Sequence, residues 1–216
     1  MTNSTPNTNQ TASIQPTLIL IPDISGFTKF INETEIAHSK LIIVKLLEAI
    51  LEANEIGLSV SEIGGDAVLF YKLGDAPPLS NIAGQFKTMF LKFHHSLNEF
   101  DRERTSECEA CGTAKGLTLK IIVHFGKVST IQIKDYMKLL GTDVILAHRL
   151  LKNNLLEKEY ILMSKNYLHT RPNEELKAID WTEVKEGSID YEHIGLVSYV
   201  YVSLSPLHKH VPSLPE

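Results

Sequence analysis

Two turns that each carry an aspartate constrain the fold of this chain more than any other feature of its sequence. The first, residues 22–28, follows an apolar run at residues 17–21 that is rich in β-branched side chains and typical of a buried strand. The second, residues 62–68, holds a Gly-Gly pair between two strand-like runs, which predicts a tight hairpin. We therefore expect Asp23 and Asp66 at the tips of adjacent strands.

The residues around these aspartates are suited to bind cations and phosphate. A helical pattern begins at Ser25, so free backbone N–H groups would point outward from a helix start, where phosphate binds well. These groups belong to Gly26, Phe27 and Thr28. Two carboxylates on adjacent tips are hard oxygen ligands for one or two divalent cations, which favours phosphoryl or nucleotidyl transfer. Each aspartate taken alone is also compatible with a helix N-cap or a turn residue.

From these residues onward the chain resembles the class III nucleotidyl cyclases. Asp23 to Thr28 is similar to the family's D-I-x-G-F-T signature, and Gly65-Asp66 is similar to its second metal-binding G-D. Ile122 to Gly126 matches the G-I-H-x-G strand and turn, and Gly141 to Arg149 occupies the place of G-D-T-V-N-x-A-x-R. The resemblance covers Thr17 to Leu204 and implies the α+β, ferredoxin-like fold of that family.

The resemblance also implies an activity. Such a domain converts a purine nucleoside triphosphate, GTP or ATP, to a 3′,5′-cyclic nucleotide and pyrophosphate. Asp23 and Asp66 match the carboxylates that hold two Mg²⁺ or Mn²⁺ ions, and the carbonyl of Ile24 would complete the shell of the second ion. The backbone of residues 26–28 matches the segment that holds the triphosphate. Arg149 matches the catalytic arginine, which neutralises charge on the α-phosphoryl group in the transition state.

Three positions decide how far this implied activity extends. Glu62 stands at the purine-reading position, where a carboxylate favours guanine because it accepts from N1–H and the 2-amino group. Lys138 replaces the aspartate or cysteine that also touches the purine, and it would pair with Glu62 or donate to guanine O6. Ile145 replaces the asparagine that orients the ribose, and His148 is either a substitute or a surface residue. The alternative to an active cyclase is a catalytically degenerate module that binds a nucleotide or a partner protein.

The resemblance implies an assembly as well. In this family the metal-binding aspartates come from one subunit and the helix arginine from its partner. We therefore expect a head-to-tail homodimer with two sites at the interface. Composition alone is equally compatible with a monomer or with an unrelated dimer.

A second group of metal-type residues lies in the middle of the chain. His94-His95 precede Cys108 and Cys111, which form a single Cys-x-x-Cys pair. Imidazole and thiolate are the ligands that zinc prefers in a tetrahedral site. The spacing matches no common zinc module, so a structural Zn²⁺ and two free loop thiols both stay open.

Composition limits the remaining classes. A chain of 216 residues with 43% hydrophobic residues can build one sizeable core. The formal net charge of −5, without a long basic run, disfavours nucleic acid and anionic membranes as partners. No apolar segment approaches the roughly 20 residues that span a bilayer. The two cysteines imply no disulfide framework, which fits a reducing cytoplasm.

The pattern along the chain predicts one domain between two tails. We expect a disordered tail at residues 1–16, a cyclase-like domain at residues 17–205 and a C-terminal tail at residues 206–216. The predicted order of elements, β-α-α-β-β-α-β-β-α-β-β-β, contains the split βαβ arrangement of ferredoxin-like folds, with helices on one side of a largely antiparallel sheet. The prediction includes a long helix at residues 80–104, a hairpin that turns at Gly126 and a strand at residues 181–185.

Overall fold

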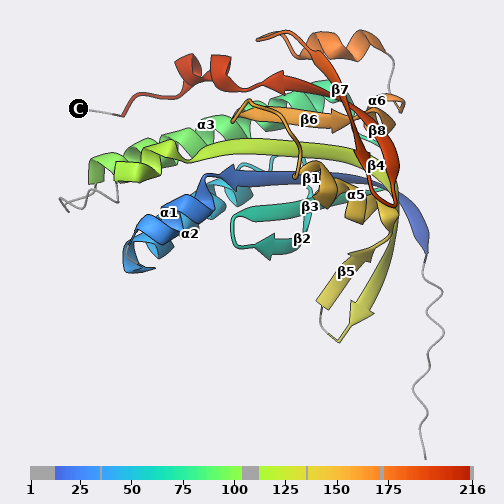
Figure 1. Cartoon of the computed structure of the whole chain (residues 1–216), viewed down its shortest axis with the longest axis horizontal. Coiled ribbons are helices and arrows are strands. Elements are labelled where there is room, and N and C mark those ends of the chain that lie inside the picture. Colours follow the sequence, from blue (N-terminus) through green and yellow to red (C-terminus); the bar gives the residue numbers. More distant parts are fainter. Residues whose placement is uncertain (1–12, 35, 104–111, 135, 171–172, 215–216) are drawn as a thin grey trace, which may run out of the picture.

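An eight-stranded sheet forms the centre of the molecule (Figure 1). The computed structural model describes residues 13–34, 36–103, 112–134, 136–170 and 173–214. The strands are β1 (Ile14–Ser25), β2 (Ser59–Gly64), β3 (Ala67–Leu73), β4 (Thr118–Ile133), β5 (Tyr136–Leu140), β6 (Tyr160–Ser164), β7 (Lys185–Tyr191) and β8 (Gly195–Ser203). Their order in the sheet is β2-β3-β1-β4-β6-β8-β7, with β5 paired to β4. In the described part of the chain only β4 and β6 pair in parallel, so the largely antiparallel α+β fold is confirmed.

Helices cover both faces of this sheet. The α-helices are α1 (Phe27–Glu33), α2 (Ile36–Glu52), α3 (Leu79–Glu103), α5 (Thr142–Leu150) and α6 (Lys165–Leu168), and the 3₁₀ helices are η1 (Thr113–Gly116), η2 (Asn173–Ala178) and η3 (Ser205–His210). Leu18 and Leu20 of β1 pack with α2 and α3, whereas Ile19 and Ile21 pack with α5. The prediction of helices on one side is therefore wrong for α5. The continuous apolar run in β1 is the signature of a strand that is buried on both faces.

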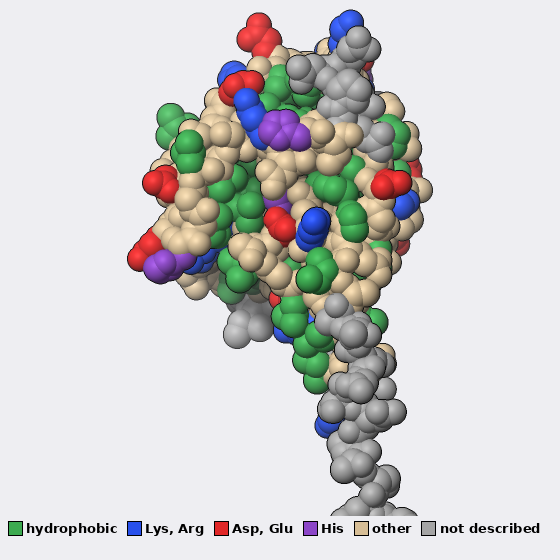
Figure 2. Space-filling model, turned by 90° about the vertical axis from the view of Figure 1, so that its right-hand side faces the viewer, with side chains coloured by type: hydrophobic (Ala, Val, Ile, Leu, Met, Phe, Trp, Pro, Cys, Tyr) green, Lys and Arg blue, Asp and Glu red, His purple; other side chains and the backbone are tan. Residues whose placement is uncertain are grey.

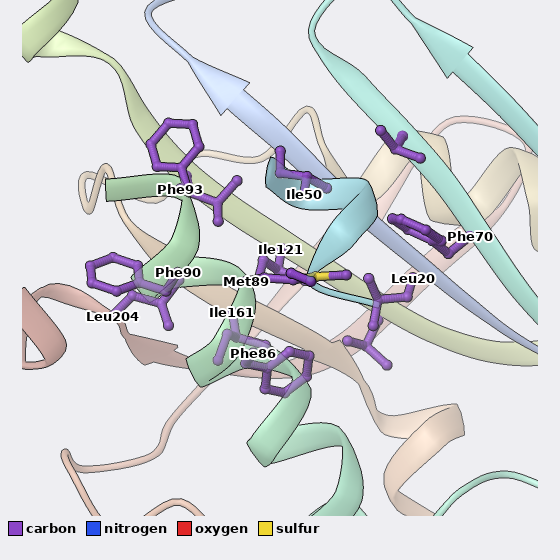
Figure 3. Close-up of a cluster of buried hydrophobic side chains, with 14 of the residues drawn as sticks. Leu20, Ile50, Phe70, Phe86, Met89, Phe90, Phe93, Ile121, Ile161 and Leu204 are labelled. Atoms are coloured by element: carbon purple, nitrogen blue, oxygen red, sulfur yellow. The ribbon is translucent and has the colours of Figure 1, made fainter. Parts of the chain in front are cut away.

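The predicted long helix is confirmed, and its apolar stripe is core. Figure 3 shows side chains of α3, among them Phe86, Met89 and Phe90, next to Ile121 and Ile161 of the sheet. All five are completely buried. A stripe at helical spacing thus identified the face of α3 that packs on β4 and β6.

Two predicted strands differ from the observed ones. The hairpin does not turn at Gly126, because β4 runs unbroken through that residue and turns instead after Ile133, where Lys134 has a φ of 54°. Residues 181–184 of the strand predicted at 181–185 form a bend and irregular backbone, and β7 begins at Lys185. Trp181 donates its ring N–H to the carbonyl of Ser203 at 2.8 Å, so its side chain packs against the sheet without joining it.

The boundaries of the two predicted tails also differ from the structure. Residues 14–16 are the first residues of β1, and only residues 1–12 of that tail lie outside the described chain. Residues 206–210 belong to η3, in which Leu207 is 2% exposed. Among the described residues, no helix combines the length and apolar character needed to cross a membrane.

Candidate functional site

The structure brings Asp23 and Asp66 together at one end of the sheet. Strands β1 and β3 pair in antiparallel fashion with Asp23 opposite Ala67. The backbone N–H of Ile24 donates to the carbonyl of Asp66 at 2.8 Å, which fixes one tip against the other. Asp66 occupies the second position of the two-residue turn between β2 and β3, as expected for a Gly-Asp corner. Backbone hydrogen bonds therefore hold Asp23, near the end of β1, next to Asp66 in the turn between β2 and β3.

Gly26 joins the first tip to α1 and requires the conformational freedom of glycine. Its φ is +87°, in the left-handed region, and a Cβ atom there would lie 3.2 Å from the carbonyl oxygen of Gly116. The ring of Phe27 reaches the other tip, where it would lie 3.6 Å from a Cβ atom on Gly65. The Asp-Ile-Ser-Gly-Phe-Thr turn therefore sits directly beside the Gly-Asp turn.

Lys120 supplies the positive charge next to these carboxylates. It lies opposite Asp23 in the pairing of β1 with β4, and its Nζ is 3.0 Å from Asp23 Oδ1. The same ammonium group donates to the carbonyl of Leu151 at the end of α5 at 3.4 Å. Sequence reasoning missed Lys120 because its proximity to Asp23 depends on strand register. That register was not apparent from local patterns.

The surroundings of Asp66 raise the pKa of its carboxyl group. Burial of the Asp66 carboxyl raises its pKa above 3.8, the charge of Asp23 raises it further, and Lys120 lowers it only in part. A raised pKa means that the site disfavours a second negative charge. A divalent cation would relieve this repulsion. The two carboxylates and the backbone carbonyl of Ile24 are hard oxygen ligands, so the residues present fit Mg²⁺ or Mn²⁺.

The other predicted site residues, Glu62, Lys138 and Arg149, are exposed. Glu62 on β2 and Lys138 on β5 are both exposed, and they form no salt bridge with each other within the described chain. Arg149 on α5 is exposed and, among the described residues, makes no hydrogen bond or salt bridge with Asp23 or Asp66. Asp23 and Asp66 thus lie on neighbouring strand tips, and the described residues show no hydrogen bond or salt bridge from Glu62, Lys138 or Arg149 to either aspartate.

The same helix presents the residue that departs most from the cyclase pattern. Ile145 is 55% exposed, and His148 is exposed as well. An isoleucine at the surface offers no hydrogen bond to a ribose hydroxyl. Among the described residues, no hydrogen bond or salt bridge assigns His148 the missing role.

A buried hydrogen-bonded trio anchors the start of α5. His124 of β4 is fully buried, its Nδ1 lies 2.7 Å from Ser164 Oγ, and its Nε2 lies 2.8 Å from Asp143 Oδ1. Asp143 Oδ2 accepts from the backbone N–H of Lys127 at 2.7 Å. The hydrogen bond with His124 lowers the pKa of Asp143, against the opposing effect of burial. Ser164 is 1% exposed and caps α6, so this trio is structural.

Gly126 allows that trio to form. A Cβ atom at this position would lie 2.1 Å from Cγ of Asp143. The glycine that suggested a hairpin turn is therefore a close-approach residue inside a continuous strand.

The two histidines of the predicted zinc group, His94 and His95, contact different carboxylates. Nε2 of His94 lies 2.6 Å from Oε1 of Glu159, and Nε2 of His95 lies 3.4 Å from Oε1 of Glu99. The two histidines therefore point to different partners. Cys108 and Cys111 lie outside the described residues, so the Cys-x-x-Cys prediction stays a prediction.

Residues 43–160 match the family model described as "Protein of unknown function (DUF2652)". This chain belongs to that family. A relative of the DUF2652 chain, the uncharacterized protein Rv2561/Rv2562 of Mycobacterium tuberculosis, is 29% identical over 128 residues. The matched segment spans 56% of this chain and 56% of the relative.

Solved structures of cyclases share the fold of the DUF2652 chain. The guanylyl cyclase Cya2 aligns with a TM-score of 0.64 at 19% identity, covering 88% of this chain and 92% of that one. The guanylate cyclase domain of RhGC from Catenaria anguillulae, in complex with GTP, aligns with a TM-score of 0.59 at 17% identity, covering 89% and 98%. The adenylyl cyclase CyaB from P. aeruginosa aligns with a TM-score of 0.57 at 17% identity, covering 89% and 96%. At these identities the likeness shows a cyclase-like fold.

Proposed function

We propose that this protein is a metal-dependent purine nucleotide cyclase that forms a 3′,5′-cyclic nucleotide and pyrophosphate. One observation carries the proposal. Asp23 and Asp66 lie side by side on two hydrogen-bonded strand tips, within a fold that solved cyclase domains share. The incompletely balanced charge at this point supports a bound divalent cation.

The proposed reaction needs charge neutralisation and in-line positioning. The ribose 3′-oxygen forms a bond to the α-phosphorus, the bond from that phosphorus to the bridging oxygen breaks, pyrophosphate leaves and the hydroxyl proton passes to solvent. Bound Mg²⁺ or Mn²⁺ would stabilise negative charge on the attacking and leaving oxygens. Asp23, Asp66 and the carbonyl of Ile24 would hold the ions, and Lys120 would keep a further positive charge beside the phosphates. The start of α1, residues 26–28, would hold the triphosphate through its backbone N–H groups.

Glu62 favours GTP over ATP as the substrate in this proposal. The side chain is exposed on β2, where a β-bulge between Val60 and Glu62 interrupts the pairing with β3. A carboxylate accepts the two guanine donors, and adenine has no equivalent pair. Lys138 is exposed on β5 and would donate to guanine O6.

A head-to-tail homodimer would complete the site. Arg149 is exposed and, within the described chain, does not contact the aspartates, so the transition-state arginine would come from a second copy. The β4–β5 hairpin extends from the body of the molecule (Figure 1), and Figure 2 shows hydrophobic side chains at the surface on that side. Large apolar side chains are exposed on three neighbouring elements, namely Val60 and Ile63 of β2, Met137 and Leu140 of β5, and Ile145 of α5. Such a cluster is typical of an interface.

The direct test is product formation. Purified protein is incubated with GTP or ATP and Mn²⁺, and the products are separated by chromatography. We expect the cyclic nucleotide from GTP, with no product from an Asp23→Ala variant. Asp75→Asn, at an exposed position, is the matched control and should retain activity. Equal amounts of cyclic product from the wild type and Asp23→Ala, or no product from the wild type, would overturn the proposal that the protein is a cyclase.

Mixing two inactive variants tests the shared site. Asp23→Ala and Arg149→Ala each damage a different half, so a mixed head-to-tail dimer contains one intact site. Random exchange of subunits should restore about one quarter of wild-type activity. No recovery after subunit exchange, verified by mass-tagged subunits, would show that both residues act within one chain or in no common site.

The second candidate is a nucleotide-binding module without catalysis. Ile145 favours it, because an exposed isoleucine replaces the residue that should orient the ribose. This candidate predicts that GTP raises the melting temperature while no cyclic product accumulates. The two measurements on one preparation distinguish the candidates.

A further inference from the structure

Two histidines and a glutamate from three separate elements converge on the opposite face of the sheet from α5. His94 lies on α3, Glu159 directly precedes β6, and His208 lies on η3. Nε2 of His94 is 2.6 Å from Oε1 of Glu159, and Nε2 of His208 is 2.6 Å from Oε2 of the same carboxylate. One nitrogen from each ring and one carboxylate oxygen all lie within 4.8 Å of one another. These residues are 65 and 49 positions apart along the chain, so the convergence is a product of the fold.

Each of these three groups is held in place by its surroundings. The ring of His94 packs against Phe90 and Phe93, with centroid distances of 4.4 and 5.0 Å. The backbone carbonyl of Glu159 accepts from the N–H of Leu204 at 3.0 Å, and Leu204 is the residue that precedes η3. The same hydrogen bond therefore sets the distance between Glu159 and the helix that carries His208. Ligands that are positioned before binding lose little conformational entropy when an ion arrives.

Two of the three side chains in the cluster are buried, and the third is half-exposed to solvent. The side chains of His94 and Glu159 are 8% and 6% exposed, whereas that of His208 is 48% exposed. A carboxylate that is buried among aromatic rings requires a cation or strong hydrogen bonds. The exposed side of His208 provides an entry path from solvent. Burial would raise the pKa of Glu159, but the hydrogen bonds and charges of His94 and His208 outweigh burial and lower it.

We propose that His94, Glu159 and His208 form a binding site for a first-row transition metal ion of the Zn²⁺ class. Two imidazole nitrogens and one carboxylate oxygen are a ligand set that such ions take, with one position left for water. At about 2.0–2.2 Å from each ligand, the ion would move each ring slightly away from the carboxylate. It would tie η3 to α3 and to the start of β6.

This site is distinct from the pair of aspartates. Ile121 pairs with Ile161, so Tyr160 is level with Lys120 in the sheet, and Glu159 lies at the same end as Asp23. Tyr160 packs with the α5 face, whereas Glu159 turns to α3. Hard oxygen ligands at one face and imidazoles at the other select different ions.

The test is metal binding by the full chain after treatment with a chelator and its removal. Zn²⁺ is titrated by calorimetry, and Co²⁺ by the visible absorption of its coordination sphere. We expect one saturable ion per chain at this site and a Zn²⁺-dependent rise in melting temperature. Replacement of His208 by Ala should weaken binding by at least about 100-fold, since loss of a direct ligand costs no less than loss of a residue that supports one. His208 is half-exposed, so this variant should fold.

Three controls separate the site from others. His95→Ala removes the neighbouring histidine, which faces Glu99, and should bind Zn²⁺ as the wild type does. The Cys108→Ser/Cys111→Ser variant should also keep the site, and so should Asp23→Asn/Asp66→Asn. Glu159→Gln keeps the shape of the carboxylate and should lose binding. Absence of saturable binding, or binding that survives His208→Ala and Glu159→Gln, would overturn the proposal and leave a metal-free His-Glu-His tie.

Discussion

Asp66 lies in the turn between β2 and β3, Asp143 lies in the first turn of α5, and their surroundings shift the pKa values of the two carboxyl groups in opposite directions. Asp66 has another carboxylate, Asp23, beside it, and its pKa is raised by burial and by that charge. Asp143 has a histidine and a backbone N–H as partners, and its pKa is lowered. The first environment penalises a negative charge, whereas the second stabilises one.

This contrast separates a site that needs a ligand from a network that is complete. The Asp143 trio satisfies each polar group from within the chain and therefore adds stability. The Asp23–Asp66 pair keeps a charge repulsion that lowers stability, and a sequence optimised for stability alone would not retain it. A cost of this kind is expected where function depends on binding a cation.

The largest effect should come from the residue that lets the network form. Gly126→Ala places a methyl group where the Asp143 carboxylate lies, so the variant loses that network or distorts β4. We expect a loss of about 2–4 kcal/mol in the free energy of unfolding, measured by urea denaturation. The matched control is Gly84→Ala, which lies on the exposed face of α3 with open space around it and should gain about 0.5–1 kcal/mol. Equal stability of the two variants would contradict the packing argument.

Asp143→Asn should produce the next largest effect. The amide loses the charge-assisted bond with His124, and we expect a loss of about 1–3 kcal/mol near neutral pH. Because the folded pKa lies below the ordinary 3.8, the stabilisation is complete above pH 3.8 and is lost as pH falls through the folded pKa. Urea denaturation at several pH values measures the difference in the free energy of unfolding between the wild type and Asp143→Asn. A difference that stays constant into strong acid would show that the charge of Asp143 contributes nothing to stability.

Lys120→Met should raise the affinity of the Asp23–Asp66 pair for a divalent cation. Without nucleotide, Lys120 competes with a divalent ion for Asp23, since its Nζ is 3.0 Å from the carboxylate. We expect Mn²⁺ to bind about threefold to tenfold more tightly to the variant in calorimetry. Lys127→Met, on an exposed position of the same strand, is the control and should leave Mn²⁺ affinity unchanged. Weaker Mn²⁺ binding to Lys120→Met would mean that the lysine organises the carboxylates.

Asp66→Asn should have the smallest effect on stability, with the opposite sign to Asp143→Asn. Removing a carboxylate with a raised pKa should increase the melting temperature of the metal-free protein by about 1–2 °C near neutral pH. The gain should disappear as pH falls from the raised folded pKa to below 3.8, where Asp66 is protonated whether folded or unfolded. Scanning calorimetry with and without Mn²⁺ measures this. Mn²⁺ should stabilise the wild type but not Asp66→Asn. A lower melting temperature of metal-free Asp66→Asn than of the metal-free wild type would contradict the repulsion between Asp23 and Asp66.

Local sequence patterns predicted the parts of the fold that depend on neighbours in the chain. The apolar stripe of α3 and the two aspartate turns follow from spacing and turn chemistry. The hairpin at Gly126 was wrong, because a glycine in a strand can mark either a turn or a close approach. The contact of Asp143 that decides between them comes from another element and has no local signal.

The same limit explains which site residues were found. Asp23 and Asp66 were recognisable because each stands in a turn with its own sequence signature. The contact between Lys120 and Asp23 requires the register of β1 on β4, and a register shift by one residue would move that lysine to the other face. The cluster of His94, Glu159 and His208 was not anticipated, because residues from three elements meet there.

Residue order alone was sufficient to predict most of the strands and helices, the aspartate-bearing turns and the likeness to cyclases. Tertiary packing decided which charges neutralise which, that α5 covers the second face, and that His94 of α3 meets Glu159. The physical reason is the distance along the chain over which each kind of interaction acts. Turn and helix preferences act over a few neighbouring residues, whereas strand register and burial are set by the whole chain as it closes its core.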